Sequence, residues 1–152
     1  MERGRIGLLT RLQLVVLKYR LRGYSLREIA RITGTSHQNI RVAEKRAIEN
    51  IEAARKTLIA YHILSSPVKI VFNKGTHLVD IPATIIRECD REGVRLRADF
   101  TYIYKLIRYN TRSCVRGTHV VEPILVLVSS NGGVHVYPYG EVESILEYLE
   151  RI

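Results

Sequence analysis

Apolar side chains recur with a helical period throughout the first 64 residues. Residues 10–22 form the first helical pattern, with one apolar face made by Leu12, Val15, Val16 and Tyr19. Residues 26–33 form a second, shorter pattern, and a third begins near Ser36 and meets no helix breaker before Pro67. The pattern predicts three helices, the last of them much longer than the others.

Each predicted helix begins with a candidate capping box, in which a hydroxyl side chain and a Gln or Glu three residues later exchange hydrogen bonds with backbone N–H groups. The three pairs are Thr10 with Gln13, Ser25 with Glu28, and Thr35 with Gln38. Each pair stands where an apolar period begins, so the boxes support the three predicted helix starts.

The second half of the chain alternates strand-like and helical patterns. Proline at 67 favours an end to the long helix, so we predict one domain at residues 1–64 and a second at residues 65–152. The second domain is expected to hold strands at 68–72 and 94–98, a helix at 82–92, a helix that Asp99 caps and that runs through Tyr109, and a hairpin closed by Asn-Gly-Gly at 131–133. A terminal helix at 141–152 is expected to bury Val142, Ile145, Leu146, Leu149 and Ile152.

The predicted fold class is therefore α+β. An N-terminal, all-helical helix-turn-helix domain with an extended third helix is followed by a small α+β domain. That second domain contains a β-hairpin and a terminal amphipathic helix.

Charge divides unevenly between the predicted domains. The 152 residues carry a net charge of +9; residues 1–64 hold 13 Lys/Arg and 5 Asp/Glu, whereas residues 65–152 hold 11 and 10. A basic half beside a near-neutral half indicates that one half meets a polyanion, and the alternative is a solvated surface that keeps the protein soluble. The chain has no apolar run long enough to span a membrane and no signal-peptide pattern at its start, so we expect a soluble, cytoplasmic protein without a membrane partner.

Residues 26–46 meet the packing demands of a helix-turn-helix. Such a motif needs a small residue where its two helices cross, a turn residue, and an apolar inner face on the second helix. Ala30, Gly34, and the pair Ile40 and Ala43 fill these roles. Thr33 departs from the pattern, because Leu or Ile is usual directly before the glycine.

The outer face of the third helix then carries side chains that suit DNA. We expect base contacts from Gln38, Asn39 and Arg41, since amides pair with adenine and guanidinium pairs with guanine. Phosphate contacts are expected from Arg27, Thr35, Ser36, Lys45 and Arg46. His37 could serve either role or cap the helix, and the alternative for the whole face is a solvated polar surface. Arg3 and Arg5 could form an arm into a neighbouring groove, although a frayed terminus is the simpler interpretation.

Beyond the base-reading turns, the long helix carries apolar residues at heptad spacing. Ile40, Ala47, Ala54 and Tyr61 form one series, and Ile51 and Leu58 form a second that Glu44 interrupts. This seam could join two copies as a short coiled coil and make a homodimer, or it could pack on the chain's own second domain.

Candidate chemistry in the second half is sparse. No nucleotide loop, catalytic elbow or metalloprotease motif is present, so we expect neither an enzyme nor a cofactor. His77, His119, His135, Cys89 and Cys114 match no zinc spacing, and the sequence leaves open whether the two thiols pair. Arg108, Arg112, Arg116 and His119 could hold an anionic effector or a stretch of DNA backbone, or could simply be exposed loop charge.

The pattern "LTRLQLVVLKYRLRGYSLREIARITGTSHQNIRVAEKRAIENIEAARKTL", which ends at Leu58, resembles the Tfx family of archaeal DNA-binding regulators. "IARITGTS" and "EKRAIENIEAARKTL" are its most specific pieces, and the resemblance continues through "DIPATIIRECDREGV" and "VVEPILV". The family implies a transcriptional regulator with an N-terminal helix-turn-helix. Its members have been described with an acidic C-terminal part, whereas this one is near neutral, so acidic activation is not expected.

Together these features predict a sequence-specific double-stranded DNA-binding transcriptional regulator that reads the major groove through the helix near Ser36. One alternative is a regulator whose second domain senses a small molecule or anion. A less favoured alternative is a nucleic-acid enzyme or its accessory subunit.

Overall fold

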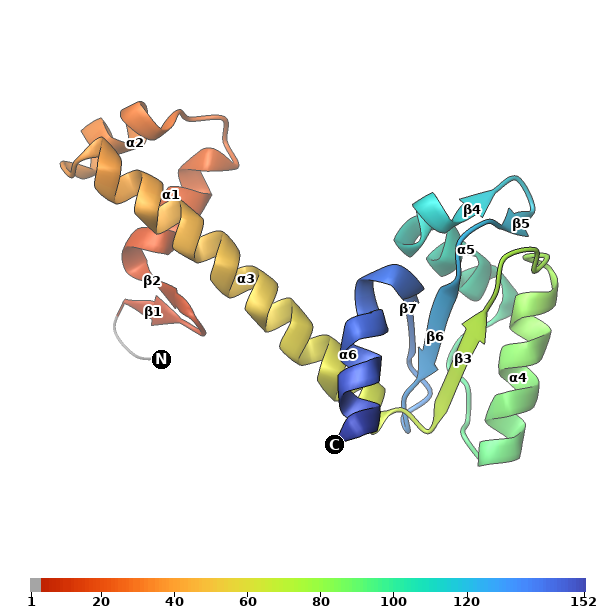
Figure 1. The fold of residues 1–152 in the computed structure, drawn as a ribbon. Coiled ribbons are helices and arrows are strands. Elements are labelled where there is room, and N and C mark those ends of the chain that lie inside the picture. The colour runs from red at the N-terminus through yellow and green to blue at the C-terminus, as the bar shows by residue number, and fades with distance from the viewer. Residues whose placement is uncertain (1–3) are drawn as a thin grey trace. The chain divides into compact units, whose positions relative to one another are not determined.

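A computed structural model describes residues 4–152, which mix helices with small sheets as the α+β class predicts (Figure 1). The chain forms two compact units that divide between Thr57 and Leu58. The division falls inside the longest helix, whose last two turns pack within the second unit. The predicted domain boundary after residue 64 lies at the end of those turns and stays a prediction.

Three helices dominate the first unit, and a short hairpin precedes them. Its elements are β1 (Arg5–Ile6), β2 (Leu9–Thr10), α1 (Arg11–Arg20), α2 (Leu26–Thr33) and the larger part of α3 (His37–Ser65). The prediction of an all-helical unit is therefore wrong at β1 and β2, which are too short to show a strand period. Asn50 Nδ2 donates to the carbonyl oxygen of Leu8 at 3.1 Å, which ties this hairpin to α3.

Two of the three predicted helix caps form where the sequence places them. The Thr10–Gln13 box is complete: Gln13 N donates to Thr10 Oγ1 at 3.3 Å and Thr10 N donates to Gln13 Oε1 at 3.0 Å. Ser25 Oγ accepts from Glu28 N at 3.2 Å and donates to the Glu28 carboxylate, so this box forms only in its first half.

The predicted Thr35–Gln38 box is wrong by one residue. Asn39 N donates to Ser36 Oγ at 3.1 Å, so Ser36 caps α3. The Thr35 amide instead donates to the carbonyl oxygen of Ala30 at 3.2 Å and helps to close the end of α2. Thr35 therefore belongs to the turn, and its hydroxyl accepts a side-chain hydrogen bond from Asn39 Nδ2.

A small core joins the three helices of the first unit, and it is made by Val16, Ile29, Ile40 and Ala43. The predicted inward face of α1 is wrong at Leu12, which is 37% exposed, whereas Gln13 is only 7% exposed. Gln13 turns inward because its side-chain oxygen accepts the Thr10 amide, and this bond satisfies a polar group that burial would otherwise penalise.

The second unit is built on a three-stranded antiparallel sheet with the order β3-β6-β7. Its elements are β3 (Val68–Phe72), α4 (Asp80–Glu92), α5 (Phe100–Asn110), the 3-10 turn η1 (Arg112–Cys114), β4 (Val115–Arg116), β5 (His119–Val120), β6 (Ile124–Val128), β7 (Val134–Pro138) and α6 (Tyr139–Arg151). The Asn-Gly-Gly hairpin between β6 and β7 is confirmed, with Val128 opposite Val134. The short strands β4 and β5 form a second hairpin.

Both faces of this sheet are covered, which explains why all five residues of β6 are buried. Alternate residues, among them Ile124, Val126 and Val128, pack with α4 and α5 on one face. Leu125 and Leu127 pack on the other face with α6 and with Ile59 and Ile63 from the end of α3.

Three details of the second unit differ from the prediction. Residues 94–98 form no strand. Arg97 N donates a backbone hydrogen bond to the carbonyl oxygen of Gly132 at 3.0 Å, but no strand pairing continues from it. Helix α4 begins at Asp80, ahead of Pro82, and Ile152 is 83% exposed beyond the end of α6.

Among residues 4–152, no helix combines the length and the apolar character needed to cross a bilayer.

Candidate nucleic-acid interface

The turn between α2 and α3 follows the predicted packing closely. Gly34 ends α2 in the left-handed conformation at φ 70°, where a glycine has no steric penalty. Ile40 and Ala43 are buried against the helices beside it. Thr33 replaces the usual Leu or Ile without leaving an unpaired hydroxyl. Its hydroxyl donates a hydrogen bond to the carbonyl oxygen of Ile29 at 2.7 Å.

Eight of the nine predicted DNA-contacting side chains are exposed, and Thr35 is half-buried. The exposed ones are Arg27, Ser36, His37, Gln38, Asn39, Arg41, Lys45 and Arg46. A helix turns about 100° per residue, so Gln38, Arg41 and Lys45 lie opposite the buried Ile40 and Ala43. These three therefore form the outermost face of α3.

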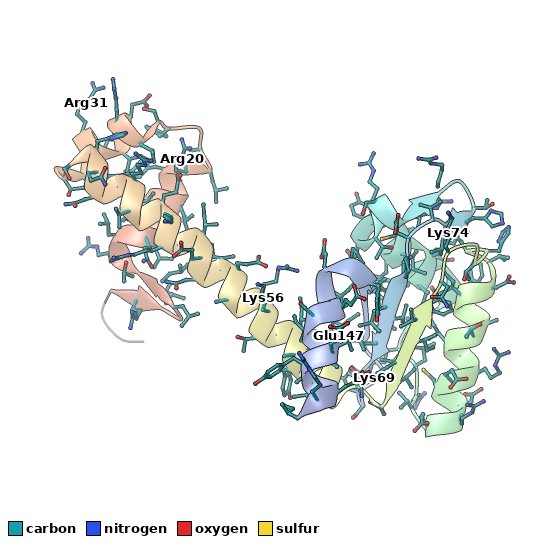
Figure 2. All side chains as sticks on the ribbon, viewed as in Figure 1. Arg20, Arg31, Lys56, Lys69, Lys74 and Glu147 are labelled. Atoms are coloured by element: carbon teal, nitrogen blue, oxygen red, sulfur yellow. The ribbon has the colours of Figure 1, made fainter. Side chains whose placement is uncertain are left out.

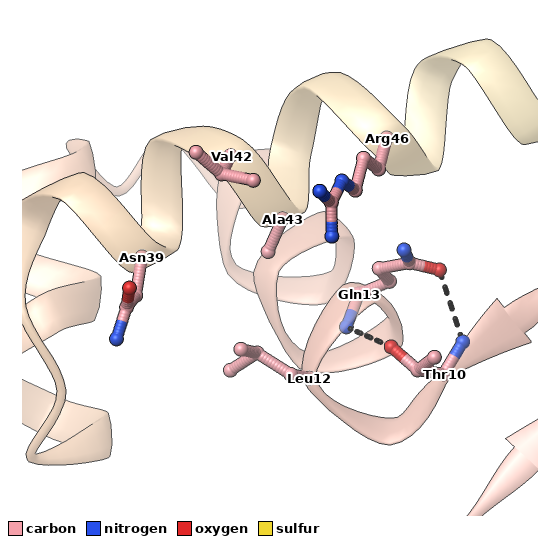
Figure 3. A pocket seen from close by; sticks show the side chains of 7 residues that line it. All are labelled: Thr10, Leu12, Gln13, Asn39, Val42, Ala43 and Arg46. Carbon is pink, nitrogen blue, oxygen red and sulfur yellow. Dashed lines mark hydrogen bonds between the residues drawn. The ribbon is translucent and has the colours of Figure 1, made fainter.

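Asn39 and Arg46 lie on one flank of α3 rather than on its outermost face. Both line a hollow of about 310 Å³ beside the first turn of α1, together with Thr10, Leu12, Gln13, Val42 and Ala43. Figure 3 shows Arg46 extending from α3 toward Gln13, with Asn39, Val42 and Ala43 on the neighbouring turns of α3. Asn39 and Arg46 therefore share this hollow with residues of α1.

Two further residues of the first unit, Val42 and Arg31, were not among the predicted contacts. Val42 lines the hollow, although a lone half-buried valine on a polar face carries no distinctive signal. Arg31 in the last turn of α2 is exposed, and Figure 2 shows its side chain extending away from the helices. Arg5 is exposed in β1, whereas Arg3 lies outside the described residues.

Four histidines of the second unit lie in two pairs. His77 and His119 are in edge contact, with ring centroids 4.7 Å apart, while His135 stacks on His62 at 4.0 Å. In the part of the chain that the structure describes, no group of three or more His, Cys, Asp or Glu side chains is arranged to hold a metal ion.

Cys89 and Cys114 are free and buried. Burial raises the pKa of both thiols, which disfavours the reactive thiolate. Their pairing, left open by the sequence, does not occur in this structure.

These features define a two-unit α+β protein whose basic, helical first unit presents a polar and basic helix face. Residues 54–136 match the family described as DNA-binding protein, Tfx, C-terminal. The chain is 39% identical over 100 residues to "DNA-binding protein Tfx" of Methanothermobacter marburgensis, covering 66% of this chain and 72% of that protein. It belongs to the Tfx family, as the resemblance from Thr10 to Leu58 and through the later segments predicts.

A second relative matches nearly the whole chain. The chain is 37% identical over 133 residues to a Methanococcus vannielii protein named "Putative transcriptional regulatory protein", covering 88% of this chain and 94% of that protein. These two relatives carry the names of DNA-binding or regulatory proteins and not of enzymes.

Proposed function

We propose that this protein is a non-catalytic, sequence-specific double-stranded DNA-binding transcriptional regulator. Helices α2 and α3 act as a helix-turn-helix, and the first turns of α3 enter the major groove. The observation that carries the proposal is the outermost face of α3, where Gln38, Arg41 and Lys45 stand opposite a buried apolar face.

The chemistry of these side chains divides into reading and positioning. The Gln38 amide and the Arg41 guanidinium have the paired hydrogen-bonding groups that distinguish base pairs in the major groove. Lys45, one turn beyond Arg41, presents a point charge that suits a phosphate. Asn39 and Arg46, on the flank beside α1, would meet the strand that borders the groove. Arg27, Thr35, Ser36 and His37 surround the α2–α3 turn and would fix its register on the backbone.

A homodimer would place two such helices on a symmetric site. Ile40 and Ala47 from the predicted seam are buried within the first unit and so are not offered to a second copy. Ile51, Leu58 and Tyr61 further along α3 are 47%, 57% and 65% exposed, which supports pairing through these residues. Two half-sites about 34 Å apart on DNA would be the consequence.

The test is selection of random duplex DNA by the full chain at physiological salt, where nonspecific phosphate attraction is weakened. We expect an enriched motif, and the Gln38→Ala and Arg41→Ala variants should each lose preference at one position of it. Arg87→Ala, which removes an exposed arginine from α4, is the control for charge and should enrich the same motif as the unaltered protein.

Failure of the unaltered protein to enrich any motif, with binding that simply fades as salt rises, would contradict sequence reading. A motif without two-fold symmetry, together with a monomeric mass for the complex in sedimentation, would contradict the dimer while leaving base reading intact.

A further inference from the structure

The second unit is near neutral overall, but its charges are strongly segregated. Residues 100–121 contain four basic side chains, Lys105, Arg108, Arg112 and Arg116, and no Asp or Glu. Helices α4 and α6 hold eight of the ten acidic residues that follow residue 64. One region of this unit is therefore locally cationic and suits an anionic partner.

Helix α5 adds exposed aromatic rings to this cationic region. Ile103 and Ile107 face the core, so the helical period turns Tyr102, Lys105 and Tyr109 outward. Tyr102 is 51% exposed and Tyr109 is 88% exposed. Large, bare aromatic rings interleaved with basic side chains are typical of surfaces on which nucleobases stack.

Arg108 is held in place beside these rings. Its Nη2 donates to Tyr104 Oη at 2.6 Å and to the carbonyl oxygen of Gly117 at 2.8 Å, and its guanidinium carbon lies 4.8 Å from the centroid of the Tyr104 ring. These contacts leave the Nε and Nη1 donors without a partner among residues 4–152. An arginine fixed in this way loses little side-chain entropy when an anion binds.

Arg108, Tyr109 and Arg112 line a hollow of about 520 Å³. Its size is within the range of small-molecule sites, roughly 300–1,000 Å³. We propose that this hollow binds a nucleotide unit, with the phosphate between Arg108 and Arg112 and the base stacked on Tyr109. The two guanidinium groups can donate hydrogen bonds to phosphate oxygens. The ring of Tyr109 can stack on a base, an interaction that a phosphate alone would not use.

A nucleotide unit can come from two sources, a free nucleoside phosphate or an unpaired nucleic-acid strand. Calorimetric titration of the full chain with four probes distinguishes them: ADP, adenosine, inorganic pyrophosphate and a ten-nucleotide oligothymidylate. We expect saturable binding of ADP, of the oligothymidylate or of both, and each to be tighter than binding of adenosine or pyrophosphate. Binding of ADP alone assigns the site to a free nucleotide, and binding of the oligothymidylate alone assigns it to a strand.

Variants of Tyr109 separate stacking from simple charge attraction. Tyr109→Leu should weaken binding by about fivefold or more, whereas Tyr109→Phe should retain it because the ring remains. Arg112→Ala should weaken all phosphate-bearing probes. Tyr148→Leu on α6 is the matched control, since Tyr148 is also exposed, at 59%, and lies in an acidic helix.

Equal affinities for ADP and pyrophosphate that are unaffected by Tyr109→Leu would overturn the proposal and leave a plain anion-binding hollow. Absence of saturable binding by any probe would overturn it as well. Because Tyr109 is almost fully exposed, an unchanged unfolding midpoint verifies that Tyr109→Leu folds. Arg41→Ala should leave the affinity for ADP unchanged, so ADP binding tests this hollow independently of DNA reading by α3.

Discussion

Arg20 Nε donates to Glu44 Oε2 at 2.5 Å, joining the end of α1 to the middle of α3. The same guanidinium donates through Nη1 to the carbonyl oxygen of Tyr24 in the turn before α2. Glu44 interrupts the apolar series along α3. The ion pair explains this interruption, because the Glu44 side chain contacts the Arg20 guanidinium and not an apolar surface. One arginine thereby links α1, the turn and α3.

Glu44→Gln should lower the free energy of unfolding by roughly 0.5–1 kcal/mol, a range that reflects partial solvent screening of the pair. The side chains of Arg20 and Glu44 are 42% and 21% exposed. A double-mutant cycle with Arg20→Gln in urea unfolding isolates the coupling, since Arg20→Gln alone also loses the bond to Tyr24. Glu49→Gln is the control, because its pair with Lys45 is 4.0 Å long and well exposed. A coupling of zero would mean that Arg20 acts through Tyr24 alone.

Ser36→Ala should cost about 1 kcal/mol of unfolding free energy, because it removes the hydroxyl that accepts the Asn39 amide at the start of α3. Thr35→Ala should cost less, since Thr35 Oγ1 accepts only an exposed side-chain hydrogen bond. Urea unfolding of the two variants side by side makes the comparison. The reverse order would restore Thr35 as the cap that the sequence predicts.

Helix positions were predictable because the apolar period and the caps are local signals. Helix α2 spans Leu26–Thr33 as predicted, and β3 spans Val68–Phe72 as predicted. The segment 94–98 alternates like a strand, yet it pairs with no strand. Its alternation reflects core packing of Val94 and Leu96, and pairing depends on a partner elsewhere in the chain, which periodicity does not reveal.

The candidate interface was predictable in part, for the same reason. Inner and outer faces of α3 follow from its period once Ile40 and Ala43 are taken as buried. The position of Asn39 and Arg46 beside α1 depends on where α1 packs, and α1 itself shows Gln13 buried and Leu12 exposed against the apparent pattern. The hydrogen bond from the Thr10 amide to the Gln13 side chain decides that Gln13 is buried, although its hydropathy favours exposure.

Gly132→Ala should destabilise the second unit by about 2–5 kcal/mol, combining left-handed strain with a steric clash. Gly132 has φ 86°, and a Cβ there would lie 2.0 Å from the carbonyl oxygen of Arg95. Gly75→Ala is the matched control, with φ 93° and no atom within 4 Å of the added carbon. Thermal or urea unfolding of both variants separates the backbone strain, which both variants carry, from the steric clash, which only Gly132→Ala carries. Equal losses would show that the hairpin moves away from residues 95–97 without penalty.

The stability of the second unit should fall as the pH drops below the ordinary pKa of histidine, about 6.5. Burial, and secondarily the neighbouring His62, lower the pKa of His135, whose ring also stacks on His62. The unfolded chain therefore binds a proton at a higher pH than the folded chain does, so stability present above pH 6.5 is lost as the pH falls through the folded-state pKa.

His135→Gln should flatten this dependence when unfolding midpoints are measured between pH 8 and pH 5. His37→Gln in the first unit is the control, since His37 is exposed on α3. A steeper fall in the His135→Gln variant would exclude His135 as the group responsible.

Arg41→Ala and Lys45→Ala should weaken DNA binding in different ways, although both residues lie on the outermost face of α3. Loss of a guanidinium that reads a base should cost about 1–3 kcal/mol and relax preference at that position. Loss of a phosphate contact should weaken binding to all sequences alike and reduce the salt slope by about one unit. Salt-dependent titrations of both variants against the selected motif and a scrambled duplex measure these quantities. Glu49→Gln controls for loss of the weak Lys45–Glu49 pair. Equal, sequence-blind losses in both variants would remove Arg41 from base reading and leave α3 as a helix that positions the protein on the backbone.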